Sequence, residues 1–532
     1  MIFTSSRYLI FLAGTLFLLG LVPGREVKKR CLAAASCFFY AAWDWRYLGL
    51  LLAISVIDYC AAGRIEASAS PRARKGWLLV SITSNLGILG YFKYCNFFIE
   101  NFNALTASFG LTVPRLDVLL PAGISFYTFK TMSYTIDVFR GHIKPCRSWL
   151  DYATFVTFFP ELIAGPIVRA SVFLPQMGRR IGPTGRRLVA GASLFLLGLA
   201  KKMLIADRMA EVADTVFGQA GAFDTATVWC GVAAYTLQIY CDFSGYSDMA
   251  IGSARMIGYD LPENFRMPYL SLNIVEFWHR WHMTLSAWLR DYLYIPLGGN
   301  RHGTLLTYRN LLLTMLLGGL WHGASWNFVL WGGLHGTALA AHKLWTRFRE
   351  RVGWQGRSWA GAKPLAWLVT LLFVMICWVP FRSHSFGDTL VLMKAMVGIG
   401  AGHYHWLPVW LFRCLGLCLL GHAIGWCIEK RLGAAQVQTA VIRKIELEPE
   451  VRATRFGRSD SGGSQVEPSE RFSPMDKLLG WMGVEIQAHG LSGAWMVPAR
   501  VTAIGAYAVT LLVLVTLFFA PLNSNPFIYF QF

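Results

Sequence analysis

The sequence predicts an all-α protein that crosses a membrane many times. Of its 532 residues, 55% are hydrophobic and only 15% are charged, whereas soluble globular chains carry about 25% charged residues. The apolar residues lie in long runs, comparable to the ~20 residues that a bilayer-spanning helix needs. The sequence has no series of ten-residue alternating segments, which a membrane β-barrel would require. Since only helices and closed barrels satisfy backbone polar groups in lipid, the predicted class is polytopic and α-helical.

Eleven apolar runs predict where the membrane elements lie. Some runs are short and others are long enough to hold two elements, so we expect about 11 to 13 transmembrane or re-entrant helices. In chain order the runs are Tyr8–Val22, Cys31–Ala42, Tyr47–Ala62, Trp77–Phe98, Val118–Phe139, Leu188–Ala206, Ala226–Phe243, Leu311–Ala341, Leu365–Phe381, His405–Ile428 and Val501–Leu522.

The net charge of +19 fits basic loops of a membrane protein better than a nucleic-acid-binding surface. Three basic clusters are separated by two predicted spans each: 25–30, 72–75 and 140–147. Lysine and arginine are enriched in cytoplasmic loops, so these alternate loops face the cytoplasm. We therefore expect a periplasmic or extracellular N-terminus, membrane lipid as the surroundings, and no nucleic-acid partner.

The chain is expected to have three parts. Residues 1–433 form the membrane domain, in which the aromatic and basic segment 244–304 predicts amphipathic helices at the cytoplasmic face. Residues 158–169 are apolar but interrupted by prolines and a glycine, which predicts an irregular, re-entrant element buried in protein. The polar segment 434–474 predicts a flexible exposed loop, and 475–532 a C-terminal membrane helix region.

One candidate site residue, His322, lies in the apolar stretch GGLWHGASW. The run Leu311–Ala341 is 31 residues long; as one helix it would measure ~46 Å, more than a ~30 Å hydrocarbon core. Two full spans would need about 40 residues, so the run fits neither case. Its glycines favour a break, which would place His322 deep in the protein near a helix end. An ionisable group at that depth indicates a functional site, and the alternative is a neutral, hydrogen-bonded core histidine.

A second candidate is the stretch EFWHRWHMTLSAWLRDY, at 276–292. His279 and His282 are three residues apart, which predicts neighbouring positions on one helix, with Ser286 one turn further on. A His-x-x-His pair can bind a metal, but no third ligand has matching spacing, so no metal site is expected. A histidine positioned for proton transfer fits better, and an interfacial helix anchored by tryptophan and arginine is the alternative.

A third candidate is YCDFSGYSDMAIG at 240–252, in which Asp242 and Asp248 flank Ser244 and Gly245. These carboxylates either pair with nearby arginines or orient a catalytic histidine. The eleven cysteines are scattered and form no Cys-x-x-Cys motif, so neither a disulfide framework nor a zinc site is predicted.

Two stretches together resemble the histidine motifs of the membrane-bound O-acyltransferase family. They are FWHRWHMTLSAWLRDYLYIPLGGNR at 277–301 and GGLWHGASWNFVLWGGLHG at 318–336. The bacterial branch that contains the alginate O-acetyltransferase membrane subunit and the D-alanyl transfer protein of teichoic acid is the most similar. Further stretches that carry the resemblance are LPAGISFYTFKTMSYTIDVFRG at 120–141, FFPELIAGPIVR at 158–169, YCDFSGYSDMAIG at 240–252, NFRMPYLSLNIVEF at 264–277 and the terminal NPFIYFQF.

The resemblance implies a ring of helices around a thin centre with a cytoplasmic funnel. It implies that His322 is the central histidine, acting as general base, and that His282 binds or polarises the acyl group. It assigns no role to His279. Contacts with the substrate or orientation of catalytic groups are expected from Asp242, Asp248, Ser286, Trp321 and Arg290.

The implied activity is transfer of an acetyl group across a bacterial inner membrane for O-acetylation of an exopolysaccharide such as alginate or cellulose. The donor would be a cytoplasmic thioester, acetyl-CoA or an acyl carrier, with no tightly bound cofactor, and a periplasmic acetyltransferase would be the partner. One alternative is D-alanyl transfer to teichoic acid. The other is a proton-coupled transporter or export channel with an intramembrane proton relay, which the lack of an internal repeat disfavours.

Overall fold

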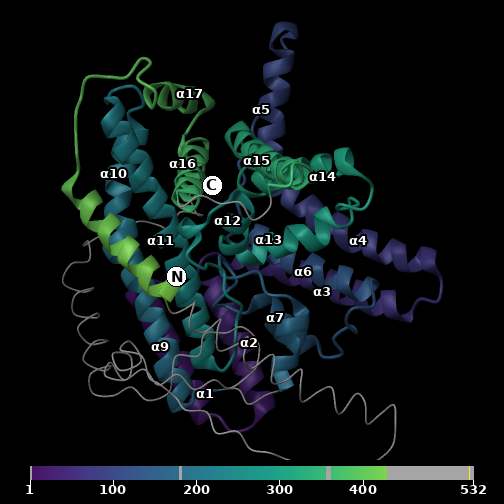
Figure 1. Ribbon diagram of the computed structural model, residues 1–532. Coiled ribbons are helices and arrows are strands. Elements are labelled where there is room, and N and C mark those ends of the chain that lie inside the picture. Colours follow the sequence, from purple (N-terminus) through teal and green to yellow (C-terminus); the bar gives the residue numbers. More distant parts are fainter. Residues whose placement is uncertain (1–2, 179–181, 355–360, 428–526, 528–532) are drawn as a thin grey trace, which may run out of the picture.

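The computed structural model describes residues 3–178, 182–354, 361–427 and Phe527, and this part of the chain is built from helices (Figure 1). Its extended pairing is limited to one isolated bridge between Phe223 and Tyr404. Four helical stretches in the described residues are long and apolar enough to cross a membrane: Trp45–Ala67, Gly185–Gly218, Ala362–Arg382 and Val409–Cys427. The chain is therefore an all-α polytopic membrane protein, as predicted.

The other predicted runs within the described residues also form helices, but several are short or interrupted. Helix α1 has 16 residues, and the run Trp77–Phe98 is divided by the π-helical turn Gly90–Tyr94. In the run Val118–Phe139 the helix begins only at Ile124, after Gly123 with a positive φ of 74°. Some of the 11 to 13 predicted elements are therefore helices that lack the length or the hydropathy of a full membrane span.

The helices fall into three groups. The N-terminal group is α1 (Ser6–Leu21), α2 (Arg25–Ala41), α3 (Trp45–Ala67), α4 (Pro71–Leu89), α5 (Cys95–Thr106), α6 (Ile124–Phe139), α7 (Trp149–Thr157) and α8 (Ala170–Phe173). The central group is α9 (Gly185–Ala200), the π-helical η4 (Lys201–Ala206), α10 (Asp207–Gly218) and α11 (Thr225–Ile257). The third group is α12 (Ile274–Arg280), α13 (Met283–Leu289), the π-helical η6 (Arg290–Tyr294), α14 (Thr304–His322), α15 (Trp326–Arg351), α16 (Ala362–Arg382) and α17 (Phe386–Ala395).

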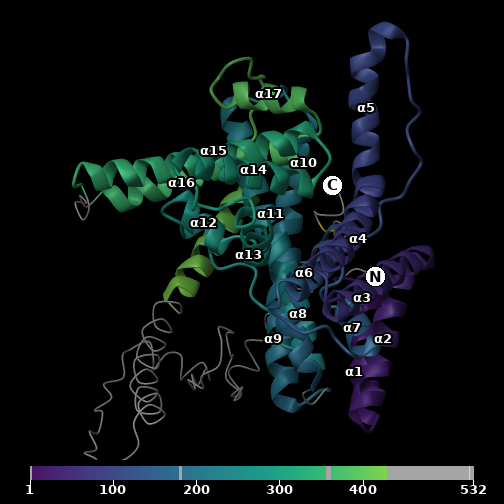
Figure 2. The same cartoon turned by 90° about the vertical axis from the view of Figure 1, so that its right-hand side faces the viewer.

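Figure 2 shows how these groups are arranged. Helices α9 and α11 form a column between α1–α3 on one side and α12, α15 and α16 on the other, while α5 projects from the body of the molecule. Several helices begin at a side-chain cap, which satisfies backbone N–H groups that have no partner within the helix. Asp44, Thr184, Asp224 and Ser325 accept such bonds at the starts of α3, α9, α11 and α15.

Helices α9 and α11 approach each other through two reciprocal pairs of glycines. A Cβ atom added to Gly191 would lie 2.6 Å from the carbonyl oxygen of Gly252, and one added to Gly252 would lie 2.6 Å from that of Gly191. Gly198 and Gly245 form the second pair, with corresponding distances of 2.4 and 2.6 Å. Small residues allow membrane helices to pack with their backbones close together. This contact therefore holds the central column together.

Substituting Gly245 by valine should destabilise this helix pair, because the new side chain would overlap the backbone of α9 at Gly198. Overpacking of this kind costs about 1–3 kcal/mol or more. The matched control is Gly87→Val in α4, where an added Cβ meets no atom within 4 Å. We expect a lower melting temperature in detergent for Gly245→Val than for Gly87→Val. Equal melting temperatures would show that the glycine contact does not limit stability.

Residues 158–169, between α7 and α8, have no regular secondary structure, and the side chains from 158 to 168 are buried. A Cβ on Gly165 would lie 2.4 Å from Cα of Glu161, so the chain turns back tightly on itself. The predicted irregular and buried backbone is confirmed. Whether the element re-enters the membrane stays a prediction.

The predicted amphipathic segment 244–304 differs from the structure at its start. Residues 244–257 continue α11, and nearly all of them are buried. The helix ends only at Gly258, whose φ is 122°. Asp248 in this part pairs with Lys201 of η4, a partner that the local pattern does not reveal. The predicted loop 434–474 and the C-terminal region 475–532, apart from Phe527, lie outside the described residues.

Candidate active site

His322 lies at the helix break that the sequence predicts. It is the last residue of α14, and α15 begins at Trp326. The two helices touch backbone to backbone, since a Cβ on Gly319 would lie 2.2 Å from the carbonyl oxygen of Phe328 and one on Gly332 would lie 2.3 Å from that of Met315. The glycines thus permit a tight helical hairpin with His322 at its turn.

The imidazole of His322 lies in an aromatic enclosure and is only 4% exposed. Its ring centroid is 5.0 Å from that of Trp321, 5.1 Å from Trp331 and 5.2 Å from Phe381. These rings come from α14, α15 and α16. The enclosure excludes water, which strengthens electrostatic interactions with any bound group.

His282 is fully buried, but it does not share a helix with His279. Helix α12 ends at Arg280, and His282 precedes α13 with φ 41° and ψ 54°, a left-handed conformation that non-glycine residues rarely adopt. His279 remains in the last turn of α12 and is exposed. The prediction of one continuous helix with both histidines on one face was wrong.

His282 is held by a hydrogen-bond network around Asn264. Its Nδ1 lies 3.1 Å from Oδ1 of Asn264. The same oxygen accepts hydrogen bonds from the backbone N–H of Thr284 at 3.2 Å and from Oγ1 of Thr284 at 2.8 Å. Asn264 is 1% exposed. The sequence analysis did not single out either Asn264 or Thr284.

Trp321 brings the two candidate histidines into one site. Its ring centroid is 6.1 Å from that of His282 and 5.0 Å from that of His322. Phe126 of α6 lies 5.3 Å from Trp321 and 6.4 Å from His282, ring centroid to ring centroid. The indole Nε1 of Trp321 donates to the carbonyl of Ser125 at 3.2 Å. The two histidine motifs therefore converge on one buried aromatic cluster.

Lys93 was missed in the sequence analysis although it holds the end of α14. Its Nζ donates to the carbonyls of Trp321 at 2.6 Å and His322 at 2.9 Å, and to Oγ of Ser125 at 3.2 Å. The last carbonyls of a helix have no partner within the helix, so the ammonium satisfies them. The sequence does contain an indication of this role, because a lysine inside the apolar run Trp77–Phe98 is costly unless it has a specific partner.

Substituting Lys93 by methionine should loosen the end of α14, because it leaves buried carbonyl groups without a donor. Each such group costs about 1–3 kcal/mol. We expect a clearly lower melting temperature in detergent. Lys75→Met is the control, since Lys75 is an exposed lysine on the neighbouring helix α4. If both variants melt like the wild type, the contacts of Lys93 do not stabilise the site.

The other predicted site residues have contacts of different kinds. Asp242 pairs with Lys202 at 2.9 Å, and Asp248 pairs with Lys201 at 2.6 Å. Both carboxylates thus pair with lysines of η4, whereas the prediction named arginines. Ser286 donates from Oγ to the carbonyl of Trp281 at 3.3 Å. Arg290 is exposed and pairs with Asp291 at 2.7 Å.

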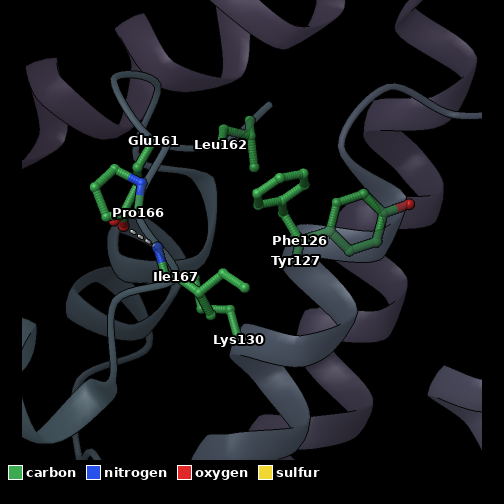
Figure 3. Close-up of a pocket in the computed structure, with 7 residues that line it drawn as sticks. All are labelled: Phe126, Tyr127, Lys130, Glu161, Leu162, Pro166 and Ile167. Atoms are coloured by element: carbon green, nitrogen blue, oxygen red, sulfur yellow. Dashed lines mark hydrogen bonds and ion pairs between the residues drawn. The ribbon is translucent and has the colours of Figure 1, made fainter. Parts of the chain in front are cut away.

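A small cavity of about 10 Å³ adjoins the site, which is room for about one water molecule. Figure 3 shows Lys130 of α6 and Glu161 of the 158–169 loop at this cavity, where they form a buried ion pair. The N–H of Ile167 donates to Oγ1 of Thr284 at 3.0 Å, which ties the loop to the His282 network. The cavity is lined by Phe126, Tyr127, Lys130, Glu161, Leu162, Pro166 and Ile167.

A helical membrane domain that brings two buried histidines to one site agrees with the resemblance to membrane acyltransferases, and comparison with known proteins identifies the family. The chain belongs to the membrane-bound O-acyltransferase family, whose sequence model matches residues 142–379. This range contains both His282 and His322. The chain is therefore an O-acyltransferase, and the resemblance seen in its motifs is confirmed.

Three relatives illustrate the similarity. A protein of Azotobacter vinelandii named probable alginate O-acetylase AlgI is 44% identical over 403 residues, which cover 75% of this chain and 79% of the relative. A peptidoglycan O-acetyltransferase of Helicobacter pylori is 40% identical over 397 residues, covering 70% and 74%. A teichoic acid D-alanyltransferase of Streptococcus thermophilus is 29% identical over 264 residues, covering 46% and 61%.

Proposed function

We propose that this O-acyltransferase moves an acetyl group from a cytoplasmic thioester donor to a hydroxyl acceptor, for O-acetylation of an exopolysaccharide. The observation that carries the proposal is the convergence of His282 and His322 on Trp321 within the family-matched region. Acetyl rather than D-alanyl transfer is favoured because the relatives named for O-acetylation are 40–44% identical over 70–75% of this chain. The D-alanyltransferase of Streptococcus thermophilus matches only 46% of it.

In the proposed reaction His322 takes the proton from the attacking hydroxyl. A histidine suits this role because its ordinary pKa lies near neutral pH. The hydroxyl oxygen forms a bond to the acyl carbon, the C–S bond of the thioester breaks, and the proton passes to the released thiol. The aromatic enclosure keeps water from competing with the acceptor hydroxyl.

We place the donor's phosphate groups near η6, where several guanidinium groups gather. Arg290 and Arg169 both pair with Asp291, and Arg140 donates to the carbonyl of Asp291 at 3.1 Å. Two of these guanidinium groups share the carboxylate of Asp291 and the third contacts its backbone, which leaves positive charge for an anionic ligand. Arg140 is the first residue of the basic 140–147 cluster that the charge pattern assigns to the cytoplasm, which suits a cytoplasmic donor.

The proposed setting is the inner membrane of a bacterium, with the N-terminus on the periplasmic side and a periplasmic acetyltransferase as partner. That partner would place the acetyl group on the polymer, which is alginate or a cellulose-type polysaccharide. The support is the alternation of basic loops and the name of the alginate relative.

Deleting the gene in its own host tests the proposal. We expect the secreted polysaccharide to lose its O-acetyl esters while the amount of exported polymer stays the same. Loss of D-alanyl esters instead would favour the teichoic acid alternative. Loss of export would favour a transporter or channel, and unchanged acetylation would refute the proposed function.

A further inference from the structure

We propose that Asn264 is a positioning residue that fixes the tautomer of His282, so that His282 binds the thioester donor as a hydrogen-bond acceptor. The group it accepts from is the amide N–H adjoining the thioester in a pantetheine-type donor. This inference rests on the proposed function for the identity of the donor. It replaces the expectation that His282 polarises the acyl carbonyl.

The orientation of the Asn264 amide follows from its neighbours. Its Oδ1 atom faces the backbone N–H of Thr284 at 3.2 Å. A backbone N–H only donates, so the atom opposite must be the amide oxygen and not its nitrogen. The oxygen in turn only accepts, so Nδ1 of His282, 3.1 Å away, must carry a hydrogen. In a neutral imidazole with hydrogen on Nδ1, Nε2 is bare and accepts.

Backbone contacts make this arrangement rigid. The N–H of Met283 donates to the carbonyl of Asn264 at 2.9 Å, and the N–H of Arg266 donates to the carbonyl of Arg280 at 2.9 Å. These bonds join the segment at 264–266 to the residues on either side of His282. They also explain how His282 is kept in a left-handed conformation, which costs a non-glycine residue about 1–3 kcal/mol.

Nε2 of His282 is buried and has no hydrogen-bond partner among the described residues. The imidazole is surrounded by rings, with its centroid 4.7 Å from Phe243, 6.4 Å from Phe126 and 6.1 Å from Trp321. Buried polar atoms in native proteins almost always have a partner. This acceptor lies in an apolar enclosure whose Trp321 ring also contacts His322, so it is placed to accept a hydrogen bond from a bound substrate.

The chemistry of the two substrates identifies that donor. The acyl carbonyl offers only acceptor oxygen, which a bare Nε2 does not bind. The hydrogen of the attacking hydroxyl goes to His322 in the proposed reaction. The remaining hydrogen-bond donor close to the thioester is the amide N–H of the pantetheine arm, which coenzyme A and acyl carriers share. His282 would thus hold the thioester beside His322.

The test uses two acetyl donors that differ in this one group. They are S-acetyl-N-acetylcysteamine and the analogue in which an ester oxygen replaces the amide N–H. In membranes containing the wild-type protein we expect release of free thiol to be roughly tenfold faster from the amide donor, the effect of one hydrogen bond. Asn264→Ala should lose this preference, whereas Asn264→Asp should keep it because a carboxylate accepts the same three hydrogens.

Two kinetic results would overturn the inference. One is a wild-type protein that uses both donors equally. The other is an Asn264→Asp variant that prefers the amide donor no more than Asn264→Ala does. A direct readout is the ¹⁵N spectrum of labelled imidazoles, with the signal of His282 assigned from its loss in His282→Gln. A hydrogen on Nε2 in the wild type would also refute the inference, whether or not the protein transfers acetyl groups. If neither donor releases thiol in the wild type, the proposed function fails, and the spectrum still decides the tautomer.

Discussion

Replacing His322 by alanine should strongly reduce acetyl transfer while the protein remains folded in the membrane. The expected loss is about 10²–10⁴-fold, the usual contribution of a general base. Folding should persist because the end of α14 is held by its backbone carbonyls, which still accept from Lys93. The measurement is the acetyl-ester content of the secreted polymer, with the level of the variant in membranes determined in parallel.

The control for this prediction is His279→Ala. His279 belongs to the same pair of motifs but is exposed at the end of α12, so its loss should leave transfer unchanged. Acetylation that survives in His322→Ala would show that another group acts as the base. If polymer export itself fails at a normal protein level, the transporter alternative gains support over acyl transfer.

The position of His322 was predictable from sequence because the reason for it is local. A run of 31 apolar residues is too long for one helix across a bilayer and too short for two. The glycines on both sides then allow the chain to fold into a hairpin. Chain length and backbone sterics act within this segment, so the pattern of the segment alone predicted the break.

The break before His282 was not predictable in this way. His279 and His282 have helical spacing, and nothing in the motif itself ends the helix between them. The helix ends because the chain at 264–266 forms backbone hydrogen bonds with Arg280 and Met283. Such bonds are tertiary, and the tertiary structure overrides the local helical pattern. For the same reason, the hydrogen-bond network around Asn264 cannot be predicted from the motifs.

Lys93 shows a third situation, in which the sequence marks the residue as unusual but does not identify its partners. A lysine within an apolar run indicates a buried partner or a function. Its partners, the carbonyls of Trp321 and His322, lie 228 and 229 residues away in the sequence. A single sequence contains no information about such a pairing, so only the fold shows that this lysine supports the site.

Replacing Lys202 by methionine is expected to have the largest effect on stability. Its Nζ lies 2.9 Å from carboxylate oxygens of both Asp207 and Asp242. The three side chains are almost entirely buried, with exposures of 5%, 1% and 2%. Removing the cation takes away the counter-charge that these two neighbouring carboxylates share, and breaking a buried ion pair costs about 3–5 kcal/mol. We expect little folded protein in detergent and a strongly reduced melting temperature.

Lys201→Met is the matched control, since Lys201 precedes Lys202 in η4 and pairs with Asp248 at 2.6 Å. That pair is more accessible, with side-chain exposures of 25% and 20%, and Lys201 neutralises one carboxylate where Lys202 neutralises two, so its loss should cost less than the loss of Lys202. Similar melting temperatures for the two variants would contradict the argument from burial.

A triple variant separates the structural role of Asp242 from its predicted role in orienting a catalytic group. Combining Lys202→Met with Asp207→Asn and Asp242→Asn removes all three charges, so folding should recover. If acetyl transfer recovers with the fold, the carboxylate of Asp242 serves only to neutralise Lys202. If the fold recovers without transfer, the charges of this cluster are required for transfer as well as for packing the central column.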